Sequence, residues 1–273
     1  MQKIIMFLFL IAISIWISVF SIDNKLQIIA CDVGQGDAIL IQKNTRQILI
    51  DGGPDGNVLY CLGKYMPFFD RTIELVILTH SDKDHVAGVV DVFKNYKIEN
   101  FLTNDLDNPK FSNQYVEVLK NMVGGGGVQI IHPTINTQIR VGMMYLDIVH
   151  PTEDFVANKT NDYSIVAVLN YLNFKAIFVG DVENKVSDNI SSNRKIGKVN
   201  YIKVNHHGSK NGLSEKLLKV LEPKIAVISV GKNNRYGHPH DEILQMLKTV
   251  NAKILRTDQV GDVIVTTDGE KIW

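Results

Sequence analysis

The densest group of side chains able to do chemistry is the six-residue run His80-Ser81-Asp82-Lys83-Asp84-His85. It directly follows Ile73–Thr79, an apolar run of the kind that forms a buried strand. A loop at a strand end can bring two imidazoles and two carboxylates to one point, and both are natural ligands of divalent metals. A solvated loop is the weaker interpretation, because only eight histidines occur in the chain and two lie here. The run therefore predicts a metal site.

Two further predicted strands end in residues that can bind a metal. An apolar strand ends at Phe178-Val179-Gly180-Asp181, where a carboxylate is well placed to bridge two ions. Another is followed by Asn205-His206-His207-Gly208-Ser209. One of these histidines is expected to be a ligand, and the other lies beside the site or at the surface. Three such strand ends in one chain are much less expected by chance than one.

These motifs resemble those of a known superfamily. The pattern His80-x-Asp82-x-Asp84-His85 resembles the His-x-His-x-Asp-His signature of the metallo-β-lactamase superfamily, with Asp82 at the second histidine's position. Ile50-Asp51-Gly52-Gly53 and Gly180-Asp181 are similar to its first and fourth motifs. A closer resemblance, over Leu26 to Gly269, is to the metallo-hydrolase domain of the competence protein ComEC. It rests on Asp32-Val33-Gly34-Gln35-Gly36-Asp37, Thr79-His80, His206-His207-Gly208-Ser209 and Gly237-His238-Pro239-His240.

The resemblance implies an α/β fold, a four-layer αββα metallo-β-lactamase sandwich, with two divalent metal ions at one edge of the sheets. By position, the implied ligands are His80 and Asp82 for the first metal, Asp84 and His85 for the second, Asp181 between them, and either His206 or His207. The third-motif histidine is not evident. Its place offers Asn161 and Asp162 instead, and His150 is a distant candidate. The sequence thus allows one ion or two, and its many oxygen ligands make Mn²⁺ competitive with Zn²⁺.

Other polar residues are expected around this site. Asp32, Gln35, Asp37 and Asp51 are predicted to fix the surrounding loops by hydrogen bonds. A second loop carries two imidazoles beside two cations, a composition that can hold a phosphate, and its residues are Lys232, Arg235, His238 and His240. The equally weighted alternative is that Pro239 begins a helix and the two histidines merely pack.

The hypothesis for function is hydrolysis of a phosphodiester, with DNA as the expected substrate and a link to DNA uptake. Two metals would lower the pKa of a bound water and neutralise the phosphate, and the metal-bound hydroxide would attack phosphorus. Asp84 would orient that water or take its proton, and His238 would hold the phosphate or protonate the leaving group. The alternatives are another hydrolase of this fold, including a β-lactamase, and a non-catalytic metal-containing nucleic-acid-binding module.

Composition gives weaker indications. Lys plus Arg equals Asp plus Glu at 29 each, so net charge names no partner, and no protein partner is indicated. Residues 194–273 carry 14 basic and 8 acidic residues, which suits a polyanion or simply a solvated surface. Cys31 and Cys61 are too few for a disulfide framework and are interpreted as buried side chains. Residues 23–273 are expected to form one hydrolase domain.

The N-terminal segment, residues 1–22, is predicted to be a transmembrane helix. The run Ile4–Ile22 has no charge and is long enough to span a bilayer. An uncleaved anchor is favoured over a signal peptide cut near Val19-Phe20-Ser21. The protein would then be membrane-anchored with its domain outside the cytoplasm, or secreted if the segment is cleaved.

The remaining pattern alternates short apolar runs with helical stretches. Strands are predicted at Leu26–Cys31, Ala38–Ile41, Gln47–Ile50, Ile73–Thr79, within 129–149, and at Ser164–Tyr171, Lys175–Val179, Tyr201–Val204, Ile225–Val230, Ile254–Arg256 and Asp262–Thr266. Helices are predicted at Asn57–Met66, Val86–Tyr96, Asn113–Met122, Leu213–Leu221 and Asp241–Val250. Strands come first in each half and helices interleave later, which suits two packed sheets with helices outside.

Overall fold

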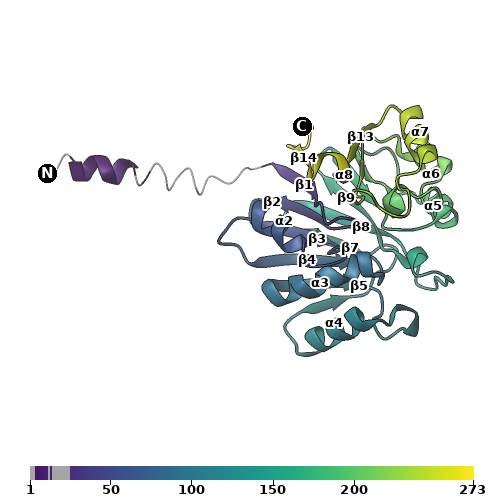
Figure 1. Cartoon of the computed structure of the whole chain (residues 1–273), viewed down its shortest axis with the longest axis horizontal. Helices are drawn as coiled ribbons and strands as arrows, with labels where there is room; N and C mark the ends of the chain where they lie inside the picture. Colours follow the sequence, from purple (N-terminus) through teal and green to yellow (C-terminus); the bar gives the residue numbers. More distant parts are fainter. Residues whose placement is uncertain (1–3, 12, 14–24) are drawn as a thin grey trace.

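The computed structural model describes residues 4–11, 13 and 25–273, and within them two sheets of seven strands each form the body of the protein (Figure 1). The first sheet has the order β14-β1-β2-β3-β4-β5-β6, with strands β1 (Leu26–Ala30), β2 (Ile39–Lys43), β3 (Arg46–Ile50), β4 (Thr72–Leu78), β5 (Lys97–Thr103), β6 (Gln129–Ile131) and β14 (Val263–Thr267). The second has the order β13-β12-β11-β10-β9-β8-β7, with strands β7 (Gln138–Val141), β8 (Met144–His150), β9 (Val166–Tyr171), β10 (Phe174–Phe178), β11 (Tyr201–Lys203), β12 (Ile225–Ile228) and β13 (Lys253–Arg256).

Each sheet has an antiparallel half and a parallel half. Strands β1 to β3 and β7 to β10 pair antiparallel, whereas β3 to β6 and β10 to β13 pair parallel. Parallel neighbours need a crossover connection, and a helix supplies it each time. The crossover helices are α2 (Val58–Tyr65), α3 (Lys83–Asn95), α4 (Gln114–Gly124), α5 (Asn184–Ile190), α6 (Glu215–Leu221) and α7 (Asp241–Thr249).

Three apolar layers hold the sandwich together. One lies between the sheets and includes Ile28, Ile48 and Phe178. A second packs α2, α3 and α4 on the outer face of the first sheet, and a third packs α5, α6 and α7 on the second. Strands covered on both faces are apolar along most of their length, which is why β4 is apolar from Ile73 to Leu78 apart from Glu74. The predicted α/β fold with two packed sheets is confirmed.

Parallel strands place their carboxyl ends at one edge of each sheet. Ile50 of β3 pairs with Ile77 of β4, so the residues after both strands are neighbours. Phe178 of β10 likewise pairs with Lys203 of β11. The three ligand-bearing strand ends of the sequence therefore follow strands β4, β10 and β11 at such edges.

The two cysteines are buried, as expected, but they form a disulfide bond, which the sequence interpretation missed. Cys31 follows β1 and Cys61 lies in α2, so the bond joins the loop 31–37 to that helix. Their separation of 30 residues gives no signal of proximity, because only the crossing of α2 over the sheet brings them together.

Residues 4–11 and 13 are helical, and the apolar side chains of Ile4 to Ile11 are exposed. In the described part of the chain, no helix is both long and apolar enough to cross a membrane. Most of the predicted 1–22 segment, including 14–22, lies outside the described residues.

Candidate metal site

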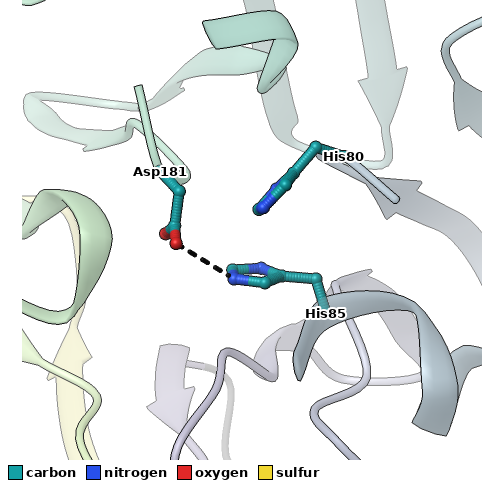
Figure 2. Close-up of side chains that lie close together, drawn as sticks. All are labelled: His80, His85 and Asp181. Atoms are coloured by element: carbon teal, nitrogen blue, oxygen red, sulfur yellow. Dashed lines mark ion pairs between the residues drawn. The ribbon is translucent and has the colours of Figure 1, made fainter. Parts of the chain in front are cut away.

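His80, His85 and Asp181 lie together at the edge of the sandwich, and Figure 2 shows their side chains pointing toward one another. His80 follows β4, His85 lies in the first turn of α3, and Asp181 follows β10. His85 Nε2 is 3.4 Å from Asp181 Oδ2, and all three side chains are buried. Each can offer one ligand atom, and these atoms lie within 4.8 Å of one another.

His207 and Asp84 complete the cluster on its other side. His207 Nε2 lies 3.4 Å from both Asp84 Oδ2 and Asp181 Oδ2. The ligand atoms of Asp84, His85 and His207 also lie within 4.8 Å of one another. Because His85 belongs to both groups, the five side chains form two adjoining sets of donors. This arrangement suits one divalent ion or two neighbouring ions.

Four buried atoms at the centre lack the partners that buried polar groups require. The Nε2 atoms of His80, His85 and His207, and Oδ1 of Asp181, make no hydrogen bond within the described ranges. An unsatisfied buried polar atom costs free energy, so native structures rarely keep one. Three unpaired imidazole nitrogens beside a carboxylate are the donor set of a divalent cation. The residues present therefore fit a metal ion.

The opposite nitrogen of each ring is held by a neighbour. Asp51 Oδ2 lies 2.8 Å from His85 Nδ1, and the Ser229 carbonyl oxygen lies 3.0 Å from His207 Nδ1. His80 Nδ1 lies 3.0 Å from Thr79 Oγ1. With Nδ1 as the donor in these contacts, the Nε2 lone pairs face the cluster.

The glycines of the first motif allow Asp51 to reach this position. Gly52 donates a backbone hydrogen bond of 2.8 Å to the His85 carbonyl oxygen at the start of α3. A Cβ atom on Gly52 or on Gly88 would collide with the backbone of the other segment. The loop can therefore pack against α3 only without side chains at these two places.

The charges within the cluster are strongly coupled. Burial would lower the pKa of His85, but the charges of Asp181 and Asp51 raise it well above its usual range. His207 behaves alike, because Asp181 and Asp37 outweigh its burial and raise its pKa. Burial would raise the pKa of Asp181, but His207 and His85 hold it well below its usual range. Without a cation, protons on two rings therefore balance the carboxylates.

The structure places His207 in the cluster and His206 at its rim. His207 is 1% exposed, whereas the His206 side chain is 23% exposed and its Nε2 lies 3.9 Å from Asp181 Oδ2. Asp82 is also peripheral. Its side chain is 41% exposed, Oδ2 lies 4.0 Å from His80 Nε2, and Oδ1 accepts a hydrogen bond from Thr160 Oγ1.

The residues considered for the third motif lie in different places. Asn161 Nδ2 is 3.5 Å from His206 Nε2, so Asn161 stands at the rim. Asp162 Oδ1 accepts a hydrogen bond from the backbone N–H of Glu183. His150 is engaged elsewhere, since its Nε2 lies 2.7 Å from the Asp162 carbonyl oxygen and its ring packs on Phe155.

The loop 32–37 supports the cluster from one side. Asp37 Oδ1 lies 3.3 Å from His207 Nδ1, and Asp37 Oδ2 lies 2.8 Å from Lys203 Nζ, with both charged groups buried. Asp37 was predicted from the sequence to lie at the site, whereas Lys203, the last residue of β11, was not. Gln35 Oε1 accepts a hydrogen bond from the N–H of Gly231, while Asp32 lies farther out and its N–H is bound by Asp262.

A second loop, 231–240, lies next to the rim. The ring of His238 lies 5.8 Å from that of His206 and 5.0 Å from that of His240. Burial, together with the charges of His207 and His206, lowers the pKa of His238 to about 4. His240 Nδ1 accepts the N–H of Lys210. Lys232 and Arg235 are exposed, and Arg235 binds the hydroxyl of Tyr236.

Residues 31–232 match the model of the metallo-beta-lactamase superfamily, and the chain belongs to that superfamily. The chain is 29% identical over 254 residues to ComE operon protein 3 of Bacillus subtilis, covering 85% of this chain and 32% of that protein. It is 29% identical over 244 residues to Recombination protein 2 of Haemophilus influenzae, covering 88% of this chain and 28% of that protein. The chain thus spans about a third of the length of these curated relatives, and the resemblance to competence proteins is confirmed.

A solved structure shows the same fold. YhfI of Bacillus subtilis, described as a metallo-beta-lactamase fold protein, superposes with a TM-score of 0.62 at 12% identity. The superposition covers 89% of this chain and 100% of that chain. At this identity the likeness supports the architecture alone.

Proposed function

We propose that this protein is a metal-dependent phosphodiesterase that cleaves DNA. The observation that carries the proposal is the convergence of three unpaired imidazole nitrogens, from His80, His85 and His207, on the Asp181 carboxylate. A basic, imidazole-bearing loop lies directly beside them and can receive a phosphate. The similarity to ComE operon protein 3 and Recombination protein 2 supports a nucleic acid as substrate and a link to DNA uptake.

The clustered residues would hold up to two metal ions. His80 and Asp181, with Asp82 at the rim, would hold one divalent ion, and Asp84, His85 and His207 would hold the other with Asp181. Bound Zn²⁺ or Mn²⁺ supplies a lowered water pKa and neutralises the phosphate charge. If only one ion binds, the position formed by Asp84, His85 and His207 is the better-formed one, because the position at His80 lacks the third-motif histidine.

Two residues would act on the substrate and on water. Burial would raise the pKa of Asp84, but the His207 ring, whose Nε2 lies 3.4 Å from Asp84 Oδ2, and the charge of His85 lower it to about 2. Asp84 is therefore ionised and can orient the attacking water by accepting its hydrogen bond. His238 is uncharged at neutral pH and its buried Nδ1 is unpaired among the described residues, which favours holding a phosphate oxygen over protonating the leaving group.

We also propose that the N-terminal segment anchors the protein in a membrane with residues 23–273 outside the cytoplasm. The Cys31–Cys61 disulfide supports this placement, because disulfides persist in oxidising compartments and are rare in the cytosol. The exposed apolar side chains of residues 4–11 are compatible with a lipid environment. Alkaline extraction of membranes tests the anchor, and digestion by a protease added to intact cells tests the sidedness.

The test of activity uses the full chain, stripped of metal and then given Mn²⁺, Zn²⁺ or Mg²⁺ with labelled single- or double-stranded DNA. Cleavage that needs metal and is lost in Asp84→Asn is the expected result. Asp91→Asn is the matched control, because Asp91 pairs with Lys94 on the outer part of the same helix. Metal bound without cleavage of either DNA would overturn the nuclease assignment.

A further inference from the structure

The loop 231–240 holds an exposed aromatic ring next to the metal site. Tyr236 is 50% exposed, and its ring stacks on that of His238 with centroids 5.6 Å apart and planes inclined by 25°.

The stacked pair leads directly to the cluster. The ring of His238 lies 5.8 Å from that of His206, whose Nε2 is 3.9 Å from Asp181 Oδ2. Three rings therefore form a path from solvent to the candidate ligands. Tyr236 remains half exposed in this stack, so its ring can meet a further π-face.

The loop is fixed before any ligand arrives. Asn234 Nδ2 donates to the carbonyl oxygens of Gly231 at 3.1 Å and His238 at 2.7 Å. Asn234 Oδ1 accepts from the N–H groups of Tyr236 at 3.2 Å and His238 at 3.0 Å. The Asn234 side chain thus holds the loop in place through four hydrogen bonds. A surface that is already ordered loses less conformational entropy when a ligand binds.

A cation accompanies the exposed ring. The Arg235 guanidinium donates a 3.0 Å hydrogen bond to the Tyr236 hydroxyl and lies 5.1 Å from the ring centre. An aromatic ring with an adjacent arginine is the combination that binds single-stranded nucleic acids, where the ring stacks on a base and the cation meets the phosphates. In a duplex, neighbouring base pairs cover the faces of each base, so this contact needs an unpaired nucleotide.

We propose that Tyr236 stacks on an unpaired nucleobase next to the phosphate that occupies the metal site, so that the site prefers single-stranded DNA. The inference rests on the proposed phosphodiesterase function and adds its specificity-determining residue. Base–aromatic stacking tolerates every base, since each has a π-face. The preference is therefore for strandedness and not for sequence.

The test compares two single strands of equal length in the metal-restored full chain, one with bases and one built of abasic sugar-phosphates. We expect wild type to show a KM about tenfold lower for the base-bearing strand. The KM ratio of the two strands should fall to near one in Tyr236→Ala and remain in Tyr236→Phe. Tyr60→Ala, which removes an exposed tyrosine from α2, should leave the ratio unchanged.

The outcomes separate this inference from the proposed function. Cleavage of both strands with equal KM by wild type would refute the stacking role and keep the phosphodiesterase. If wild type cleaves neither strand, the phosphodiesterase fails, and fluorescence anisotropy with the same two strands decides the stacking role. Tighter binding of the base-bearing strand, lost in Tyr236→Ala alone, would support it, and equal binding would overturn it.

Discussion

The carboxylate of Asp51 binds the Nδ1 atom of His85 at 2.8 Å, and both side chains are fully buried. The same Oδ2 atom accepts the hydroxyl of Thr79 at 2.7 Å, and the Thr79 oxygen in turn lies 3.0 Å from His80 Nδ1. One carboxylate therefore orients two rings of the cluster, one directly and one through a hydroxyl. Such partners of metal-binding histidines influence metal affinity as well as ring position.

Replacing Asp51 with Asn should weaken metal binding by about 10- to 100-fold, because the charge that holds the His85 proton at Nδ1 is lost. Competition with a coloured chelator measures the affinity. Asp91→Asn is again the control, since its carboxylate lies away from the cluster. An Asp51→Asn protein with unchanged affinity and correct folding by circular dichroism would contradict the role.

Replacing His206 and replacing His207 should have different effects on the metal content. His207→Ala removes a buried ring from the cluster and should eliminate at least one equivalent of bound metal. His206→Ala removes a partly exposed ring at the rim and should keep the metal content of wild type. Elemental analysis of both dialysed proteins is the measurement. The reverse pattern would show that the ligand is His206.

Lys203→Met should lower the free energy of unfolding by about 3–5 kcal/mol, because it leaves the buried Asp37 carboxylate without its cation. The double variant Lys203→Met/Asp37→Asn should recover part of this loss, since no unpaired charge remains. Urea denaturation of the metal-free proteins gives the values. Additive losses in the double variant would argue against coupling of the two side chains.

Acid should destabilise the fold partly through His150, a buried ring whose Nε2 contacts the Asp162 carbonyl oxygen. Burial lowers its pKa, although its contact with the Asp162 carbonyl oxygen opposes this. The unfolded chain therefore binds a proton that the folded chain resists, so stability decreases as pH falls below about 6.5.

His150→Gln should reduce the loss of unfolding free energy between about pH 7.5 and about pH 5.5, because glutamine does not titrate. Metal-free protein is used for both variants so that ligand protonation cancels in the comparison. Equal pH slopes for wild type and variant would exclude His150 as a source of acid sensitivity.

Local pattern was enough to predict most of the fold and the main ligand loop. The run His80–His85 is contiguous and follows a clear apolar strand. That its side chains converge on one point could therefore be predicted without knowing which distant residues pair. Strand β5 was not predicted, because Lys97, Glu99 and Asn100 interrupt its apolar pattern. Helix α5 was missed as well, since its seven residues are mostly polar.

Features that depend on distant pairing escaped prediction. Lys203 and Asp37 lie far apart in the sequence, and only the packing of the two sheets joins them. The Cys31–Cys61 disulfide and the hydrogen bonds of Asn234 within the loop 231–240 also escaped prediction, because neither produces a local sequence pattern. The choice between His206 and His207 also required coordinates, since adjacent residues point in different directions.

The division of ligands between the halves of the chain links metal binding to completed folding. His80, Asp84 and His85 come from the half built on the first sheet, whereas Asp181 and His207 come from the half built on the second. Neither half alone offers all the metal ligands, so a bound ion would link the edge of one sheet to the edge of the other. An ion that binds only the assembled sandwich raises its stability by mass action. Metal would then bind only to chains that have completed folding. When the metal is scarce, the two sheets would separate more easily.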